Sequence, residues 1–87
     1  MPVTLDEAKE YLKVEYNEED ELIQSLIQSA QQLCEDVLRG PLDNDPVVKI
    51  AVLYAVGYLF ENRIAPNFTE LTTMLKYILS SRRREVF

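Results

Sequence analysis

Few side chains in this sequence are of the types that perform catalysis, and none of them is spaced for it. The chain has no histidine and a single cysteine, Cys34, so a thiol nucleophile would have no imidazole base beside it. Cys34 also lies within an apolar helical stripe, where a cysteine acts as a small core residue. Neither glycine, Gly40 nor Gly57, belongs to a phosphate-binding loop. The sequence therefore predicts a protein that is not an enzyme and has no cofactor.

Acidic side chains are the most numerous groups that could bind a metal ion. Residues 18–21 are Glu-Glu-Asp-Glu, but they fall in the first turn of a predicted helix, where solvated acids favour the helix dipole. Asp43 and Asp45 lack the glycine and the distant glutamate of a calcium-binding loop. We therefore predict no metal site.

A run of three arginines, Arg82, Arg83 and Arg84, stands close to Phe87. Guanidinium groups pair with carboxylates or with phosphates, but the formal net charge of −6 opposes attraction of the chain to DNA. We predict that these four residues bind a protein partner. Contact with nucleic acid is one alternative, and a helix end whose bases only favour the dipole is another.

Charge is distributed unevenly along the chain. Residues 1–45 carry twelve acids and three bases, a net charge of −9, whereas residues 46–87 carry three acids and six bases, a net charge of +3. A subunit with such a dipole suits head-to-tail stacking or docking onto a partner of opposite charge. The simpler explanation is that acids gather at helix starts and bases at the last helix end.

Capping signals mark the first two predicted helices. Thr4 and Glu7 have the spacing of a capping box, which opens a short helix to about residue 12. Asn17 is the predicted cap of a second helix, in which apolar residues recur every three or four positions to residue 38. Gly40 stands where a left-handed C-cap is expected. Leu26 and Ile27 of this helix are predicted core residues.

The third predicted helix, 46 to about 62, is apolar on nearly every side and begins with an Asp45 cap. A helix of this kind is buried on most of its surface, and Leu53 is predicted to lie in the core. Three other helices in so small a domain can hardly cover it completely. We therefore predict that one flank, formed by Tyr54, Gly57 and Tyr58, contacts another subunit.

Asn67 is predicted to cap a fourth helix, which continues to about residue 80. The sequence shows no strand signal and no internal repeat. We predict an all-α fold, a compact bundle of about four helices with short loops in a single domain, 1–80, followed by a basic C-terminal tail, 81–87. No secretory signal opens the chain and no apolar stretch is long enough to cross a bilayer, so we predict no membrane contact.

These motifs occur in a recognisable order. Residues 3–14, Val-Thr-Leu-Asp-Glu-Ala-Lys-Glu-Tyr-Leu-Lys-Val, lead through an acidic turn into Glu-Asp-Glu-Leu-Ile-Gln-Ser-Leu-Ile at 19–27. The apolar third helix ends in Phe-Glu-Asn-Arg at 60–63. This order resembles the head–tail connector (adaptor) proteins of tailed bacteriophages over about residues 3–63. The end of the chain departs from the family pattern, a Leu-Pro-rich lead into a leucine pair and an arginine, because residues 68–79 are regularly helical and three arginines follow.

The resemblance implies a non-enzymatic phage or prophage subunit that assembles as a homo-oligomeric ring under the portal protein. The ring would extend the channel through which DNA passes without specific binding, and would dock the next tail or stopper protein. It implies a place at the head–tail junction of the virion, and the host cytoplasm before assembly. The basic tail would then bind an acidic surface of the portal, with the neighbouring subunit and DNA as alternatives.

A different class of function is also compatible with the composition. A small acidic regulatory or antitoxin-like protein could use its acidic first half to mask a basic partner. A DNA-binding helix-turn-helix protein would need a basic recognition helix, and neither the second nor the third helix supplies one. The sequence does not determine ring stoichiometry or which helix faces the channel.

Overall fold

The computed structural model describes residues 3–80 of the chain, which contain four α-helices and no strand. The helices are α1 (Leu5–Leu12), α2 (Asp20–Leu38), α3 (Pro46–Glu61) and α4 (Phe68–Ile78). The predicted all-α bundle of four helices is therefore confirmed. None of the described helices combines the length and the hydropathy needed to cross a bilayer.

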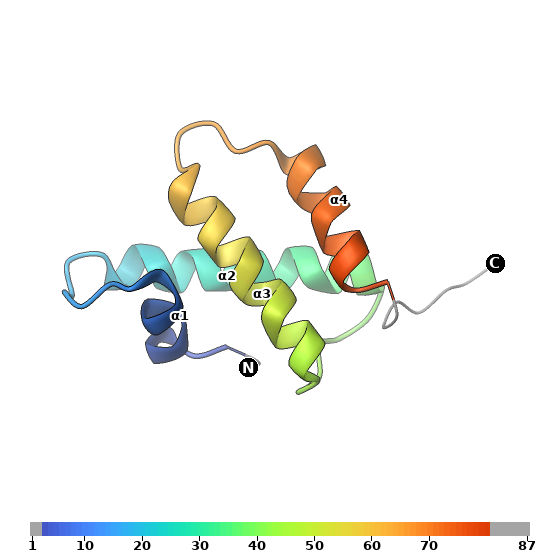
Figure 1. Cartoon of the computed structure of the whole chain (residues 1–87), viewed down its shortest axis with the longest axis horizontal. Coiled ribbons are helices and arrows are strands. Elements are labelled where there is room, and N and C mark those ends of the chain that lie inside the picture. Colours follow the sequence, from blue (N-terminus) through green and yellow to red (C-terminus); the bar gives the residue numbers. More distant parts are fainter. Residues whose placement is uncertain (1–2, 81–87) are drawn as a thin grey trace.

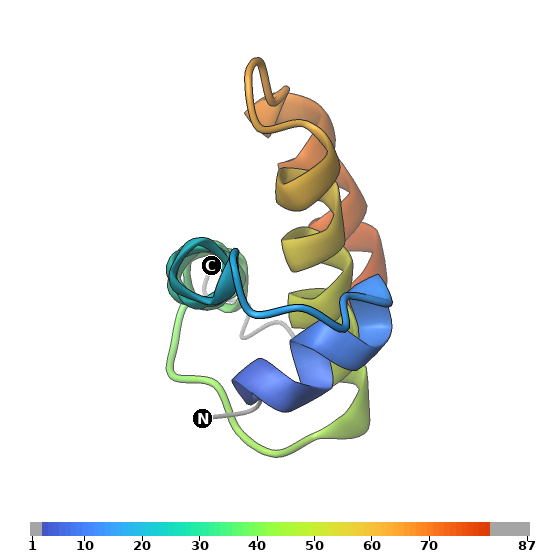
Figure 2. The same ribbon diagram turned by 90° about the vertical axis from the view of Figure 1, so that its left-hand side faces the viewer.

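Two of the helices form an antiparallel hairpin, and a third helix lies across it. α3 and α4 lie side by side and run in opposite directions, while α2 crosses them and α1 packs near the first half of α2 (Figure 1). Viewed along α2, that helix stands apart from the hairpin as a layer of its own (Figure 2). Both α2 and α3 contact each of the other three helices, so the apolar α3 shares the centre of the fold with α2.

Three of the predicted helix starts are confirmed by their hydrogen bonds. The amide of Glu7 donates to Thr4 Oγ1 at 3.2 Å, and the amide of Thr4 donates to the Glu7 carboxylate at 3.0 Å. Asp45 caps α3, where its carboxylate accepts from the Val47 amide at 2.7 Å. Asn67 caps α4 by accepting from the amide three residues later at 3.0 Å. Each cap satisfies amides that the first helical turn leaves unpaired.

The predicted start of α2 is wrong. The helix begins after Glu19, which makes no side-chain cap, and Asn17 lies too far ahead of the first turn for its side chain to reach those amides. The Asn17 side chain instead accepts a hydrogen bond from Lys9 Nζ at 2.8 Å. Its backbone carbonyl accepts from the Asp20 amide at 3.3 Å, so Asn17 shapes the turn that leads into the helix.

The predicted end of α2 is wrong by one residue. The left-handed residue is Arg39, with φ 62°, and no glycine has a positive φ among the described residues. α2 ends at Leu38, whose side chain is buried, and the reversal falls on the next residue. The amides of Arg39 and Gly40 both donate to the carbonyl of Glu35, at 2.8 and 3.3 Å. A left-handed arginine costs about 1–2 kcal/mol relative to glycine.

The core lies where α2 meets the α3–α4 hairpin, and Ile27 is fully buried in it as predicted. Leu26 and Leu53 are only half-buried at its edge, so their prediction as core residues is wrong. Leu26 lies beside, and not within, the stripe of α2 that is buried in the core. The largest fully buried side chains are Ile23, Ile27, Leu71, Leu75, Leu79, Val3, Val48, Val52, Val56 and Cys34.

Candidate assembly surfaces

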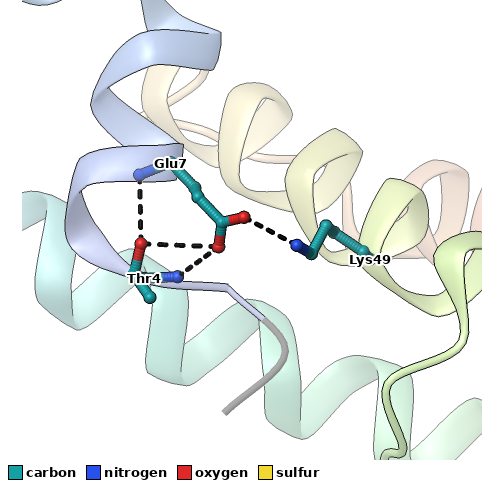
Figure 3. Close-up of polar contacts among 3 residues, drawn as sticks. All are labelled: Thr4, Glu7 and Lys49. Atoms are coloured by element: carbon teal, nitrogen blue, oxygen red, sulfur yellow. Dashed lines mark hydrogen bonds and ion pairs between the residues drawn. The ribbon is translucent and has the colours of Figure 1, made fainter.

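The first helix is held against α3 through one carboxylate. Glu7, which closes the capping box with Thr4, also accepts from Lys49 Nζ at 2.6 Å (Figure 3). The hydrogen bond from Lys49, followed by that from the Thr4 amide, lowers the pKa of Glu7 below its ordinary value. A single side chain therefore both begins α1 and positions it on α3, 42 residues away in sequence.

The acidic start of α2 is partly neutralised within the subunit. Lys9 Nζ lies 2.7 Å from Asp20 Oδ1, which ties α1 to α2. Arg63 Nη1 lies 3.1 Å from Glu19 Oε1, which ties the end of α3 to the start of α2. Two of the four acids at 18–21 thus have a structural role. Glu18 and Glu21 are left exposed.

The segment that ends α3 has an architectural role in the subunit. The side-chain amide of Asn62 donates to the carbonyl of Tyr58 at 2.9 Å and so satisfies the helix end. The Arg63 guanidinium lies 4.6 Å from the centre of the Phe60 ring, a cation–π distance, while it pairs with Glu19. Residues 60–63, Phe-Glu-Asn-Arg, therefore end α3 and connect its end to α2.

The structure places the three predicted subunit-contact residues in different surroundings. Gly57 is buried, and a Cβ atom at this position would lie 3.0 Å from Cε2 of Tyr11. The Tyr58 hydroxyl accepts from the Asn67 amide at 3.1 Å and donates to the Asn67 carbonyl at 3.3 Å. Tyr54 is half-buried. Gly57 and Tyr58 therefore already make contacts inside the subunit, and their predicted contact with a neighbour stays a prediction.

The one large hydrophobic residue of α3 that is exposed is Ile50, at 58% exposure, which the sequence did not single out. It lies four positions before Tyr54 and so on the same side of the helix. The exposure of Ile50 agrees with the expectation that the other helices do not cover α3 completely. The face defined by Ile50 and Tyr54 is called the α3 face below.

An apolar groove with a volume of about 460 Å³ opens between α2 and the loop end of the α3–α4 hairpin. Its α2 wall contains Leu22, Leu26 and Leu33, which are half-buried. The opposite wall contains Pro66 and Phe68, and the phenylalanine is 52% exposed. We call this feature the leucine groove. Its lining is mainly apolar and accessible, which is typical of a contact surface.

Sequence reasoning missed the leucine groove although a signal for it exists. Apolar residues on α2 come in adjacent pairs, such as Leu22 with Ile23 and Leu26 with Ile27. This arrangement makes the apolar arc wider than one helix–helix contact needs. In both of these pairs the isoleucine is buried in the core and the leucine lines the groove.

The remaining candidate groups have no visible chemistry in the described part of the chain. Cys34 is buried, and burial raises the pKa of its thiol to about 12, so the thiol stays protonated. No group of three or more His, Cys, Asp or Glu residues could hold a metal ion within residues 3–80. Arg82, Arg83, Arg84 and Phe87 lie outside the described residues, so their predicted binding role stays a prediction.

Comparison with known protein families extends the resemblance noted in the sequence. The family model described as phage gp6-like head-tail connector protein matches residues 2–81, a range that contains all four helices. Comparisons with curated proteins and with solved structures gave no match. Since the family model covers nearly the whole chain, this protein belongs to the phage gp6-like head-tail connector family.

Proposed function

We propose that the protein is a non-enzymatic connector subunit that forms a homo-oligomeric ring beneath the portal protein of a phage head. The match of the connector family model over residues 2–81 carries this proposal. In the assembled virion the ring occupies the head–tail junction, extends the DNA channel and docks the next tail or stopper protein. Before assembly the subunit is in the host cytoplasm.

Two apolar surfaces of the subunit support assembly. The leucine groove and the α3 face lie on different parts of the molecule, and each leaves large apolar side chains in contact with water. Removing such surface from water contributes about 25 cal/mol per Å², which must exceed the entropic cost of association. In the proposed ring, Tyr54 contacts the neighbour directly together with Ile50. Gly57 and Tyr58 shape this flank from within, by admitting the Tyr11 ring and by holding Asn67.

The charge of the subunit supports passage of DNA without specific binding. Residues 3–80 carry fourteen acidic and six basic side chains. A channel with a predominantly acidic wall repels phosphates, whereas basic side chains would retain them. DNA would therefore slide through the ring.

Assembly in the presence and absence of the portal protein tests the proposal. We expect the full chain to be monomeric when dilute and to form rings at high concentration or on the portal, measured by light scattering and negative-stain electron microscopy. Ile50→Ser should reduce ring formation because it removes an exposed contact of the α3 face. Ile64→Ser is a matched control, because Ile64 is fully exposed in the α3–α4 loop, at the other end of α3.

Two outcomes would contradict different parts of the proposal. A protein that stays strictly monomeric and never joins portal complexes would contradict the connector assignment. Equal loss of rings in Ile50→Ser and Ile64→Ser would show that the α3 face is not the specific contact of the ring, while ring assembly by the parent protein would still stand.

A further inference from the structure

We propose that residues 82–87 of one subunit bind in the leucine groove of the neighbouring copy. In this contact the arginines pair with Glu18 and Glu21, and Val86 and Phe87 fill the apolar part of the groove. The inference rests on the proposed ring and names a second contact between its subunits, in addition to that of the α3 face.

The groove requires an occupant that is apolar in one part. Leucine, proline and phenylalanine form the apolar part of its two walls, and the polar lining consists of Ser29 and Gln32 on α2 and of Asn62 and Arg63 after α3. Its α2 wall runs from Leu22 to Leu33, a distance of about 16 Å along the helix. A short peptide segment in an extended conformation fits this length.

The acids that remain available stand at one end of this wall. Glu19 and Asp20 are held by Arg63 and Lys9, whereas Glu18 and Glu21 are exposed immediately before Leu22. Neither acid lines the groove itself: both stand beside the start of its α2 wall, where the lining residue Arg63 is already paired with Glu19, and the apolar stretch of the groove follows. An occupant that matches it carries positive charge first and an apolar residue about 10 Å further on.

Residues 82–87, Arg-Arg-Arg-Glu-Val-Phe, have this composition and this order. Arg84 and Phe87 are three residues apart, which spans about 10 Å in an extended chain. On α2, the groove leucines Leu26 and Leu33 lie about 7.5 Å and 18 Å beyond Glu21 along the helix. A segment whose Arg84 pairs with Glu21 would therefore place Phe87 between these two leucines.

The segment cannot make this contact within its own subunit. The end of α4 lies beside the C-terminal part of α2, because Lys76 lines the same hollow as Val37 and Arg39. Glu21 is about 24 Å from Val37 along α2, whereas Arg84 follows Ser80 by four residues and at most about 14 Å. The order would also be reversed, since a segment running back along α2 would bring its arginines to the apolar end first.

A contact between copies has the symmetry that a ring needs. α4, which precedes the segment in sequence, ends near the C-terminal part of α2, while the acids beside the groove stand at the start of that helix. One end of each copy therefore meets the opposite end of the next. A head-to-tail contact of this type repeats around a closed ring, whereas a self-complementary contact would stop at a dimer.

Binding of a fluorescent peptide of residues 81–87 to the full chain, kept dilute and monomeric, tests the contact directly. Fluorescence anisotropy should show binding that weakens roughly tenfold when the three arginines of the peptide are serine, since two or three exposed ion pairs are lost. The Glu18→Gln/Glu21→Gln protein should lose a similar factor. Glu10→Gln/Glu70→Gln, which removes two exposed acids elsewhere, is the matched control and should bind normally.

A mixing experiment tests the direction of the contact on the portal-free ring. A groove variant, Phe68→Ser with Glu18→Gln/Glu21→Gln, and a tail variant, Arg82→Ser/Arg83→Ser/Arg84→Ser with Phe87→Ser, should each fail to form rings. Their mixture should form a 1:1 dimer and stop, because it contains one intact groove and one intact tail. Circular dichroism melting verifies that each variant is folded. Full rings from the mixture would overturn the proposal.

The alternative acceptors of the tail give different results. A peptide that binds the portal protein, or DNA, but not the subunit would show that this inference is wrong while the connector function stands. Failure of the unmodified chain to form rings or portal complexes would instead contradict the proposed function itself. If neither Phe68→Ser nor Glu18→Gln/Glu21→Gln changes the affinity for the peptide, the groove is not its binding site.

Discussion

Gly57→Ala is expected to stabilise the isolated subunit, and the size of the effect follows from two opposing contributions. Alanine in a helix interior is favoured over glycine by about 0.8–1.0 kcal/mol. Against this, the added Cβ would lie 3.0 Å from Cε2 of Tyr11, about 0.5 Å inside a comfortable carbon–carbon contact. The outcome depends on whether the tyrosine ring can move away.

Tyr11 has room to do so because it is 49% exposed. A rotation of roughly 7° about its Cα–Cβ bond moves the ring edge by about 0.5 Å, far less than the 30° that costs about 0.5–1.5 kcal/mol. We therefore expect a net gain of about 0.5 kcal/mol. For a domain of this size the melting temperature should rise by about 2–4 °C.

Thermal melting followed by circular dichroism, at a concentration where the protein is monomeric, measures this effect. In a Tyr11→Ala background the same change should gain closer to 1 kcal/mol, since the opposing contact is gone. A lower melting temperature for Gly57→Ala would refute the argument and show that the ring is held in place. Ring assembly should be retained, and its loss in a stabilised variant would show that Gly57 contacts the neighbouring subunit instead.

Three further outcomes are expected. Ile27→Ala should cost about 2–5 kcal/mol of unfolding free energy and Leu26→Ala clearly less in urea titrations, since only Ile27 is fully buried; equal costs would contradict the assigned facing of α2. Cys34, whose thiol pKa burial raises to about 12, should react with a thiol reagent at pH 8 only when the protein opens, and rapid labelling of the folded protein would contradict its burial. Because Lys49 lowers the pKa of Glu7, this carboxylate contributes stability above its unfolded pKa that is lost as pH falls through its folded pKa. The urea midpoint of Lys49→Ala should therefore lie below that of the parent above about pH 4.5 and converge with it at lower pH, and a pH-independent difference would exclude this linkage.

The helix starts that the sequence predicted correctly depend on contacts over two or three residues. Thr4 with Glu7, Asp45 with Val47 and the Asn67 cap all close inside a single turn, so the local sequence contains both partners of each bond. Because these motifs are local, their order along the sequence could also be recognised as resembling the connector family. Asn17 failed as a cap because α2 begins only after Glu19, and the Asn17 side-chain oxygen accepts instead from Lys9, eight residues before it.

The two ends of α2 show where local signals stop being decisive. Gly40 has the favoured residue type for a left-handed cap, yet the reversal occurs at Arg39. Glycine lowers the cost of that conformation by only about 1–2 kcal/mol, and packing of the last turn of α2 against the core can exceed this amount. Residue type predicted the region of the reversal, and packing selected the residue.

The sequence by itself determined that four amphipathic or apolar helices form and where most of them begin, because helix periodicity and capping are local. Only the tertiary structure decided how the wide apolar arc of α2 is divided, with Ile27 in the core and Leu26 in the leucine groove. It also decided that Glu19 pairs with Arg63, 44 residues away, and that Gly57 lies under a ring from α1. Such contacts depend on how helices cross, and a pattern within one helix carries no information about the direction from which its neighbour arrives.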